Sequence, residues 1–157
     1  LRIDGEWPTP VTLSKGWARA YARRWNSETT DAFVRLERGG AEFLGNVSNW
    51  LTEQSATSVF SPALYESATR VWTKAGFSEA HRLALMERSL GAPITDPAHV
   101  VAVANPVWDQ IEAIDKASFE GFWRMSVDGL QEALKSTRQS VLLTVGEPAV
   151  GYIIIGS

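Results

Sequence analysis

Cysteine is absent from this sequence, histidine occurs only twice, and no apolar run approaches the length of a membrane span. Without cysteine there are no disulfides and no thiolate metal sites. His81 and His99 have no carboxylates at ligand spacing, so no metal is expected. A membrane helix needs about 18 or more apolar residues, and the apolar end GYIIIGS is far shorter. No secretory signal is visible. We therefore expect a cytoplasmic protein without a membrane partner.

Charge is too balanced to indicate a nucleic-acid partner. Residues 1–90 carry 11 Lys and Arg against 10 Asp and Glu, and residues 91–157 carry 4 against 8. Nucleic-acid-binding domains usually show a clear basic excess, so no nucleic acid is expected. Hydrophobic residues make up 45% and charged residues 21%, which is typical of a globular chain. The seven Trp indicate large buried contact areas.

Three aromatic residues near the amino end are spaced by four: Trp17, Tyr21 and Trp25. This spacing fits one face of a short helix. With the arginines around them, the rings would suit a basic surface for nucleic acid. The near-neutral charge of this half favours an aromatic arm packed on the domain instead.

The rest of the first half alternates expected strands and helices. The expected elements are a strand at 31–37, a helix at 41–54, a strand at 57–61, a helix at 62–75 and a strand at 77–90. The first helix has apolar residues at helical spacing. The second begins at Pro62 with Ser61 as its cap, and Gly76 ends it.

The second half begins with a linker. Residues 91–99, GAPITDPAH, contain two Pro and one Gly and separate a domain at 1–90 from one at 100–157. A strand at 100–104, a helix opened by Pro106, a helix capped by Ser126 and a hairpin of strands 140–145 and 149–155 follow. Glu112, Asp115 and Lys116 share the first helix and are expected on its solvated face.

That order of elements resembles the opening of the GNAT N-acetyltransferases. The residues that carry the resemblance are VVAVANPVWDQIEAIDKASFEGFWRMSVDGLQEAL and SVLLTVGEPAVGYIIIGS. FVRLERGGAEFLGNVSNWLTEQS and TSVFSPALYESATRVWTKAGFSEAHRLALMERSL resemble the other end of the same fold. The resemblance implies an α/β fold, with a mixed, mainly antiparallel sheet and helices on both faces. It also implies acetyl transfer from acetyl-CoA to a small-molecule or peptide amine.

The resemblance further implies two regions for the cofactor. GYIIIG looks like the central strand of the family, which splays from its neighbour to admit the pantetheine arm, so Ile153 and Ile154 are candidate cofactor residues. The pyrophosphate sits on a Gly-rich loop at a helix start. The candidate here is Arg38, Gly39 and Gly40, which lacks the longer Arg/Gln-x-x-Gly-x-Gly/Ala spacing. A plain turn into a helix is the favoured interpretation.

The resemblance also implies that the acceptor site lies in the segment between the two helices of the second half. Phe119, Phe122, Trp123 and Arg124 are candidates to line an acceptor groove, with Glu120 as the general base. The alternative is a hydrophobic plug between the helices.

Trp72 stands where many members of the family have a tyrosine, four residues before the Gly of a Gly-Phe pair. In those members the hydroxyl can protonate the departing CoA thiolate. An indole N–H donates hydrogen bonds but is no proton source at neutral pH. The first half therefore looks non-catalytic, and Trp72 is expected to pack in the core.

Two arrangements of the halves fit these observations. In the favoured one, a tandem GNAT protein has a reduced first domain, and its second domain is cut before the CoA loop. In the other, both halves make one permuted fold. A non-catalytic acyltransferase-fold module that binds or scaffolds a protein is the alternative function.

The strand at 149–155 has neither charge nor Pro. A run of this kind suits a strand buried on both faces. We expect it to pair with a strand besides 140–145, from the first half or from a second copy in a strand-exchanged homodimer.

Overall fold

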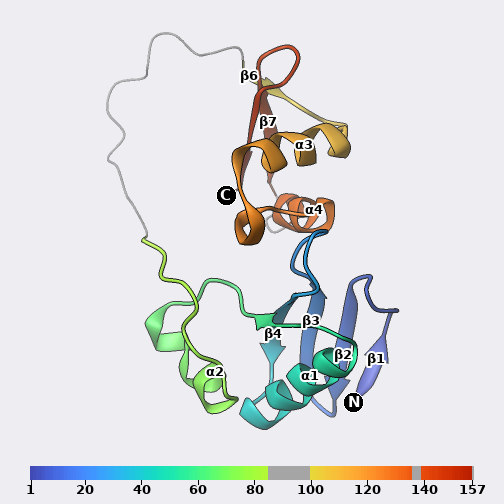
Figure 1. Ribbon diagram of the computed structural model, residues 1–157, viewed down its shortest axis with the longest axis vertical. Coiled ribbons are helices and arrows are strands. Elements are labelled where there is room, and N and C mark those ends of the chain that lie inside the picture. Colours follow the sequence, from blue (N-terminus) through green and yellow to red (C-terminus); the bar gives the residue numbers. More distant parts are fainter. Residues whose placement is uncertain (85–99, 136–138, 157) are drawn as a thin grey trace. The chain divides into compact units, whose positions relative to one another are not determined.

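The computed structural model describes residues 1–84, 100–135 and 139–156, and the chain divides into two compact units, Leu1–Met86 and Glu87–Ser157 (Figure 1). The expected linker at 91–99 lies outside the described residues. In the described part of the chain, every helix is too short or too polar to cross a membrane.

A five-stranded sheet forms the first unit, in the order β1-β2-β3-β4-β5. The elements are β1 (Arg2–Asp4), β2 (Val11–Lys15), β3 (Ala18–Arg24), β4 (Ala32–Arg38), α1 (Ala41–Glu53), β5 (Val59–Phe60), the 3-10 helix η1 (Glu66–Ala68) and α2 (Arg70–Lys74). The first four strands are antiparallel neighbours. β5 returns through α1 and pairs with β4 in parallel. The sheet is therefore mixed but mainly antiparallel.

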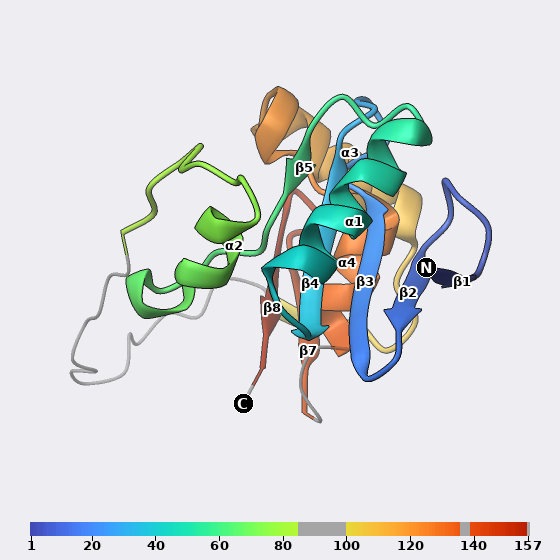
Figure 2. The same ribbon diagram turned by 90° about the horizontal axis from the view of Figure 1, so that it is seen from below.

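One face of this sheet and one stripe of α1 form the core of the first unit. Strand side chains alternate between faces, so the small Ala20 and Ala22 of β3 point to the same side. They leave room for Leu44, Val47 and Leu51 of α1, and all five residues are fully buried. Figure 2 shows α1 lying across the strands. The expected helix at 41–54 and the expected strand at 31–37 are thus confirmed.

The expected helix through Trp17, Tyr21 and Trp25 is wrong, because this segment forms β3 and its flanks. A spacing of four also fits a strand, in which every second residue shares a face. Trp17 lies in the hairpin turn after Gly16, whose positive φ of 59° suits a tight turn. Trp25 follows β3 and packs its ring against Phe60, with 5.1 Å between ring centroids.

The single helix expected at 62–75 is also wrong, because η1 and the short α2 take its place. Ser61 does not cap a helix, since its hydroxyl donates to the carbonyl of Pro62 at 2.9 Å. The segment before Arg70 lacks the repeated apolar stripe that stabilises a longer helix. The strand expected at 77–90 is absent from residues 77–84, and its remainder lies outside the described residues.

The second unit has the strand, helix, helix, strand, strand order that the sequence predicts. Its elements are β6 (Val100–Ala102), α3 (Trp108–Ser118), the 3-10 helix η2 (Gly121–Trp123), α4 (Val127–Lys135), β7 (Val141–Val145) and β8 (Gly151–Ile155). The three strands are antiparallel in the order β6-β7-β8. Ser126 caps α4 as expected, since its Oγ accepts a hydrogen bond from Gly129 N at 3.2 Å.

In the described part of the second unit, one face of the three-stranded sheet carries the core. Leu142 of β7 packs with Ile111 of α3 and Leu130 of α4, and Tyr152 and Ile154 of β8 join them. The expected mixed α/β class is confirmed, although the chain forms two sheets.

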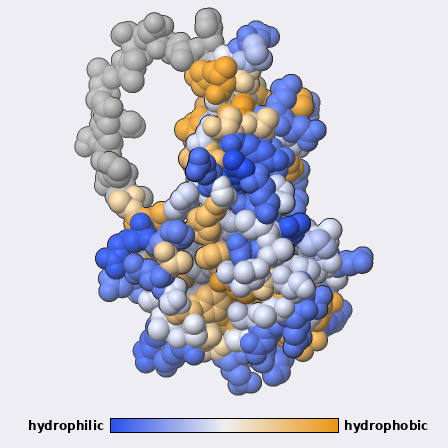
Figure 3. Space-filling model, viewed as in Figure 1, coloured by the Kyte–Doolittle hydropathy of each residue, from blue (hydrophilic) through white to orange (hydrophobic). Residues whose placement is uncertain are grey.

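β8 is not buried on both faces, contrary to the expectation for 149–155. Ile153 and Ile155 are 51% and 48% exposed, and among the described residues β8 pairs with β7 alone. Figure 3 shows exposed apolar surface, in orange, on the second unit in the upper half of the view. Pairing of β8 with another copy stays a prediction.

Candidate functional site

Five of the predicted site residues lie together in the loop between α3 and α4. Phe119 and Trp123 are 49% and 46% exposed, which is unusual for aromatic side chains of this size. Phe122 meets Trp123 edge to face, with ring centroids 5.1 Å apart. Glu120 is exposed, and its backbone carbonyl accepts a hydrogen bond from Trp123 N at 3.2 Å. The loop thus presents aromatic surface beside a solvated carboxylate.

The loop closes on itself through backbone and arginine contacts. Arg124 donates from Nε to the carbonyl of Phe119 at 2.7 Å, and its backbone N–H donates to the carbonyl of Gly121 at 3.3 Å. Gly121 has a φ of 50°, a left-handed conformation that other residues rarely adopt. Arg124 therefore has a structural contact in this loop.

The side chain of Asp115 in α3 anchors the loop through hydrogen bonds. Its Oδ2 accepts a hydrogen bond from Met125 N at 2.6 Å, and its Oδ1 accepts one from the Tyr152 hydroxyl at 2.6 Å. The side chain is only 1% exposed. A buried carboxylate is tolerated when both oxygens accept hydrogen bonds, as they do here. These two hydrogen bonds join α3, Met125 (two residues before α4) and β8.

The expectation that Asp115 lies on a solvated face is wrong. Asp115 follows the buried Ile111 by four residues, so it belongs to the apolar stripe of α3. That spacing is the signal by which sequence analysis could have found it. Glu112 and Lys116 form an ion pair one turn apart on α3, with 3.3 Å between Oε2 and Nζ.

Tyr152 remains a hydrogen-bond donor over a wide pH range. Burial raises the pKa of its phenol well above the ordinary value, and the hydrogen bond to Asp115 and the carboxylate charge add to the rise. The phenol is therefore a poor proton source at neutral pH, and it holds the Asp115 carboxylate in place.

The two isoleucines predicted at the cofactor site differ in their surroundings. Ile154 packs against the core of the second unit, whereas Ile153 points to the opposite, exposed face of β8. Both belong to the same unit as the loop at 119–125. Arg38, Gly39 and Gly40 belong to the first unit.

The Arg38–Gly40 turn connects β4 to α1. Gly39 has a φ of 140°, and a β-carbon there would lie 2.9 Å from Cδ1 of Phe43 and 3.2 Å from Cβ of Ala18. Gly40 is the N-cap residue of α1, and no side chain of the described residues caps this end. The need for glycine at position 39 is explained by packing, in agreement with a plain helix-entry turn. The first-turn N–H groups still provide partial positive charge.

β4 and β5 share only a short stretch of pairing. In the described part of the chain, β5 pairs with β4 at Ala32 and Phe33 only, while β4 continues to Arg38. The chain turns away after Phe60 toward Pro62. Among the described residues, the carboxyl end of β4, next to the start of α1, therefore has a strand neighbour on one side only, β3.

Trp72 packs in the core, as the sequence predicts, and its spacing from Gly76 has a local cause. Phe77 N donates to the carbonyl of Trp72 and Gly76 N donates to that of Thr73, both at 3.1 Å. Gly76 has a φ of 91°. This is the Schellman motif, in which the residue after Gly contacts the residue three from the helix end. The rings of Trp72 and Phe77 meet edge to face at 5.0 Å.

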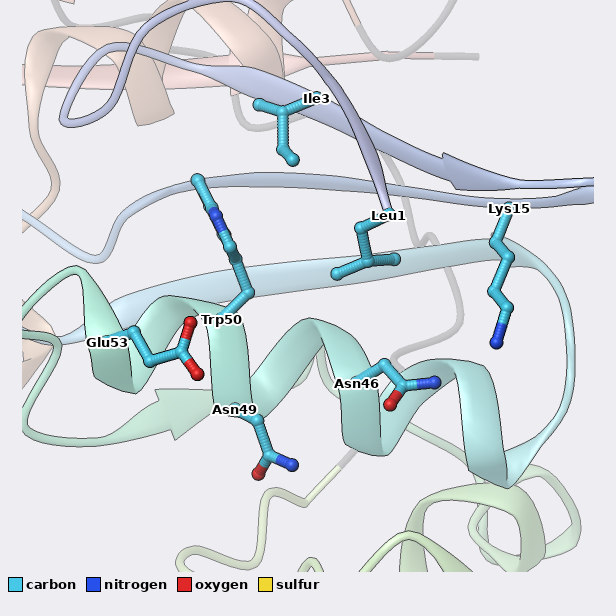
Figure 4. Close-up of a pocket in the computed structure, with 7 residues that line it drawn as sticks. All are labelled: Leu1, Ile3, Lys15, Asn46, Asn49, Trp50 and Glu53. Carbon is cyan, nitrogen blue, oxygen red and sulfur yellow. The ribbon is translucent and has the colours of Figure 1, made fainter.

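A shallow groove of about 410 Å³ lies between α1 and the first strands (Figure 4). It is lined by Leu1, Ile3, Lys15, Asn46, Asn49, Trp50 and Glu53. Trp50 is held edge to face against Trp7, with ring centroids 6.3 Å apart. The sequence analysis did not single out these residues, which come from separate elements and share no motif. The groove has no pairing of a nucleophile with a base.

Within residues 1–84, 100–135 and 139–156, no group of three or more His, Asp or Glu side chains is placed to hold a metal ion. Comparison with known proteins gave no match, whether to a family model, to a curated protein or to a solved structure.

Proposed function

We propose that this chain is part of an acetyl-CoA-dependent N-acetyltransferase of the GNAT type, which acts on a small-molecule or peptide amine. The observation that carries the proposal is the arrangement of β4, α1 and β5. The two strands are parallel and pair only at Ala32 and Phe33, and Gly39 and Gly40 follow the far end of β4. In the family that the sequence resembles, a splayed strand admits pantetheine and a Gly-rich helix start holds the pyrophosphate.

The second unit supports the proposal through its order of elements. β6, α3, α4, β7 and β8 follow one another as the opening elements of that family do, and the strands lie in the antiparallel order of a meander. On this proposal the loop at 119–125 belongs to the acceptor side of the second unit. Glu120, being exposed, would take the proton of the incoming ammonium, directly or through water.

Acetyl-CoA, when bound, supplies the thioester carbonyl that the amine nitrogen attacks. The uncapped N–H groups at the start of α1 would bind its pyrophosphate, with Arg38 as the nearby cation. Trp72 is buried and has no acidic proton, so it offers no proton to the thiolate.

A non-catalytic module that binds a protein is the second candidate. The buried indole of Trp72 favours it, because the position at which many GNAT members have a tyrosine hydroxyl is filled by core packing. Such a module would keep the fold without binding acetyl-CoA.

Calorimetric titration with acetyl-CoA separates the two candidates. We expect binding that Gly40→Asp weakens at least about 10-fold, because the new carboxylate would face the pyrophosphate at the helix start. Asp is a good N-cap residue, and a β-carbon at Gly40 meets nothing within 4 Å, so the fold should tolerate the change. Asn49→Asp adds the same charge further along α1, at an exposed position, and should leave binding unchanged. No binding by the wild-type chain would reject the proposal in favour of the non-catalytic module.

A further inference from the structure

We infer that Asp115 and Tyr152 are positioning residues, which hold the loop from Phe119 to Met125 in a fixed place beside β8 and so shape the acceptor side of the site. This inference rests on the proposed function for the identity of the acceptor. The positioning role itself is inferred from the geometry of the loop and does not depend on the proposed function.

Both ends of the loop are fixed by one residue. At its start, Phe119 N donates to the backbone carbonyl of Asp115 at 3.0 Å. At its end, Met125 N donates to the Asp115 side chain at 2.6 Å. The loop therefore leaves α3 and returns to the same residue. Any tilt of the Asp115 carboxylate would move the point at which the chain enters α4.

Tyr152 determines the orientation of that carboxylate. Its hydroxyl donates to Oδ1 at 2.6 Å, while Oδ2 holds Met125. Hydrogen bonds to an ionised acceptor are roughly twice as strong as neutral ones. Since Tyr152 lies in the interior of β8, the loop is tied to the strand and not only to its own helix.

The loop held in this way presents the groups that an amine acceptor would meet. Phe119 and Trp123 are half-exposed, and Glu120 is a solvated carboxylate between them. An ammonium group is attracted by a carboxylate and by the faces of aromatic rings. Holding these groups still before the acceptor arrives lowers the entropic cost of binding it. The arrangement suits an amine with an apolar or aromatic neighbouring group.

The test compares Tyr152→Phe, Asp115→Asn and Asp115→Ala with Tyr65→Phe as the matched control. Tyr152→Phe keeps the ring and removes only the hydroxyl. Asp115→Asn can keep both hydrogen bonds without the charge, and Asp115→Ala removes both. Tyr65 is 77% exposed in the first unit, so its hydroxyl should be dispensable.

Two measurements are made on each variant. Amide hydrogen exchange compares the loop at 121–125 with the amides of β7. Steady-state kinetics compares KM for the amine with KM for acetyl-CoA.

For Tyr152→Phe we expect the loop amides to exchange about 3- to 10-fold faster, which is the factor that corresponds to one lost hydrogen bond. The exchange of the β7 amides should change little. KM for the amine should rise by a similar factor while KM for acetyl-CoA stays within about 2-fold. Asp115→Ala should show a larger effect, and Asp115→Asn should retain most of the wild-type behaviour.

An equal rise in exchange at the loop and at β7, with both KM values unchanged, would overturn the inference and leave a stabilising role only. Unchanged exchange of the loop amides in Tyr152→Phe would also overturn the inference. This variant remains informative even if Asp115→Ala does not fold. If the wild-type protein transfers no acetyl group, the proposed function fails. Loop-specific exchange would then still decide whether the pair positions the loop.

Discussion

The ring of Phe43 occupies the space into which a side chain on Gly39 would project, with only 2.9 Å between Cδ1 and a β-carbon built on the glycine. Phe43 is a buried residue of α1, so it has little room to move. Gly39 also has a φ of 140°, which L-residues rarely adopt. The entry to α1 therefore depends on a glycine at this position for two independent reasons.

Gly39→Ala should lower the free energy of unfolding by about 2 kcal/mol or more, because backbone strain and the clash with Phe43 both oppose it. Chemical denaturation monitored by tryptophan fluorescence measures the change. Gly45→Ala is the matched control, since it lies inside α1 and its β-carbon would meet nothing within 4 Å. That substitution should stabilise by up to about 1 kcal/mol. Equal effects of the two substitutions would contradict this account of Gly39.

Trp72→Ala should destabilise the first unit by about 3–5 kcal/mol, because the indole is 5% exposed and closes the end of α2 against Phe77. The corresponding change at Trp17, which is 69% exposed in a hairpin turn, should stay within about 0.5 kcal/mol. Urea denaturation of both variants provides the comparison. A small effect at position 72 would mean that the indole does not pack as described.

Local periodicity predicts much of the fold. Apolar residues at helical spacing in α1, Ser126 before α4 and the Gly146 turn between β7 and β8 all indicate their elements correctly. Each of these signals depends on residues close together in the sequence. The spacing of Trp17, Tyr21 and Trp25 failed because it fits both a helix and a strand.

The candidate site was predicted less well, because its contacts join distant parts of the chain. The aromatic residues at 119–124, together with the family resemblance, predict an acceptor segment there. The residues that anchor it, Asp115 and Tyr152, are 37 positions apart, and only the folded chain brings them together. The sequence predicts a solvated face for Asp115, because charged residues usually lie on the surface. Its place four residues after Ile111 was the one local sign of burial.

Stability at alkaline pH should depend on Tyr152. Since the folded protein raises the pKa of this phenol, the stability it contributes is fully present below about pH 10 and is lost as pH rises above that value. Between pH 9 and about 11.5 the unfolding free energy of the wild type should therefore fall more steeply than that of Tyr152→Phe. Tyr65→Phe, at an exposed phenol, should follow the wild-type curve. Parallel curves for the wild type and Tyr152→Phe would show that the phenol is not perturbed.

The two faces of the second sheet should respond differently to truncation. Leu142 of β7 is 1% exposed and lies opposite Ile154 in the register with β8, so Leu142→Ala leaves a cavity against α3 and α4. We expect a loss of about 2–5 kcal/mol. Ile153 points to the other face and is half-exposed, so Ile153→Ala should cost less than about 1 kcal/mol. Thermal denaturation at two protein concentrations checks both values. A cost at Ile153 as large as that at Leu142, and larger at the higher concentration, would mean that a second copy covers this face in solution.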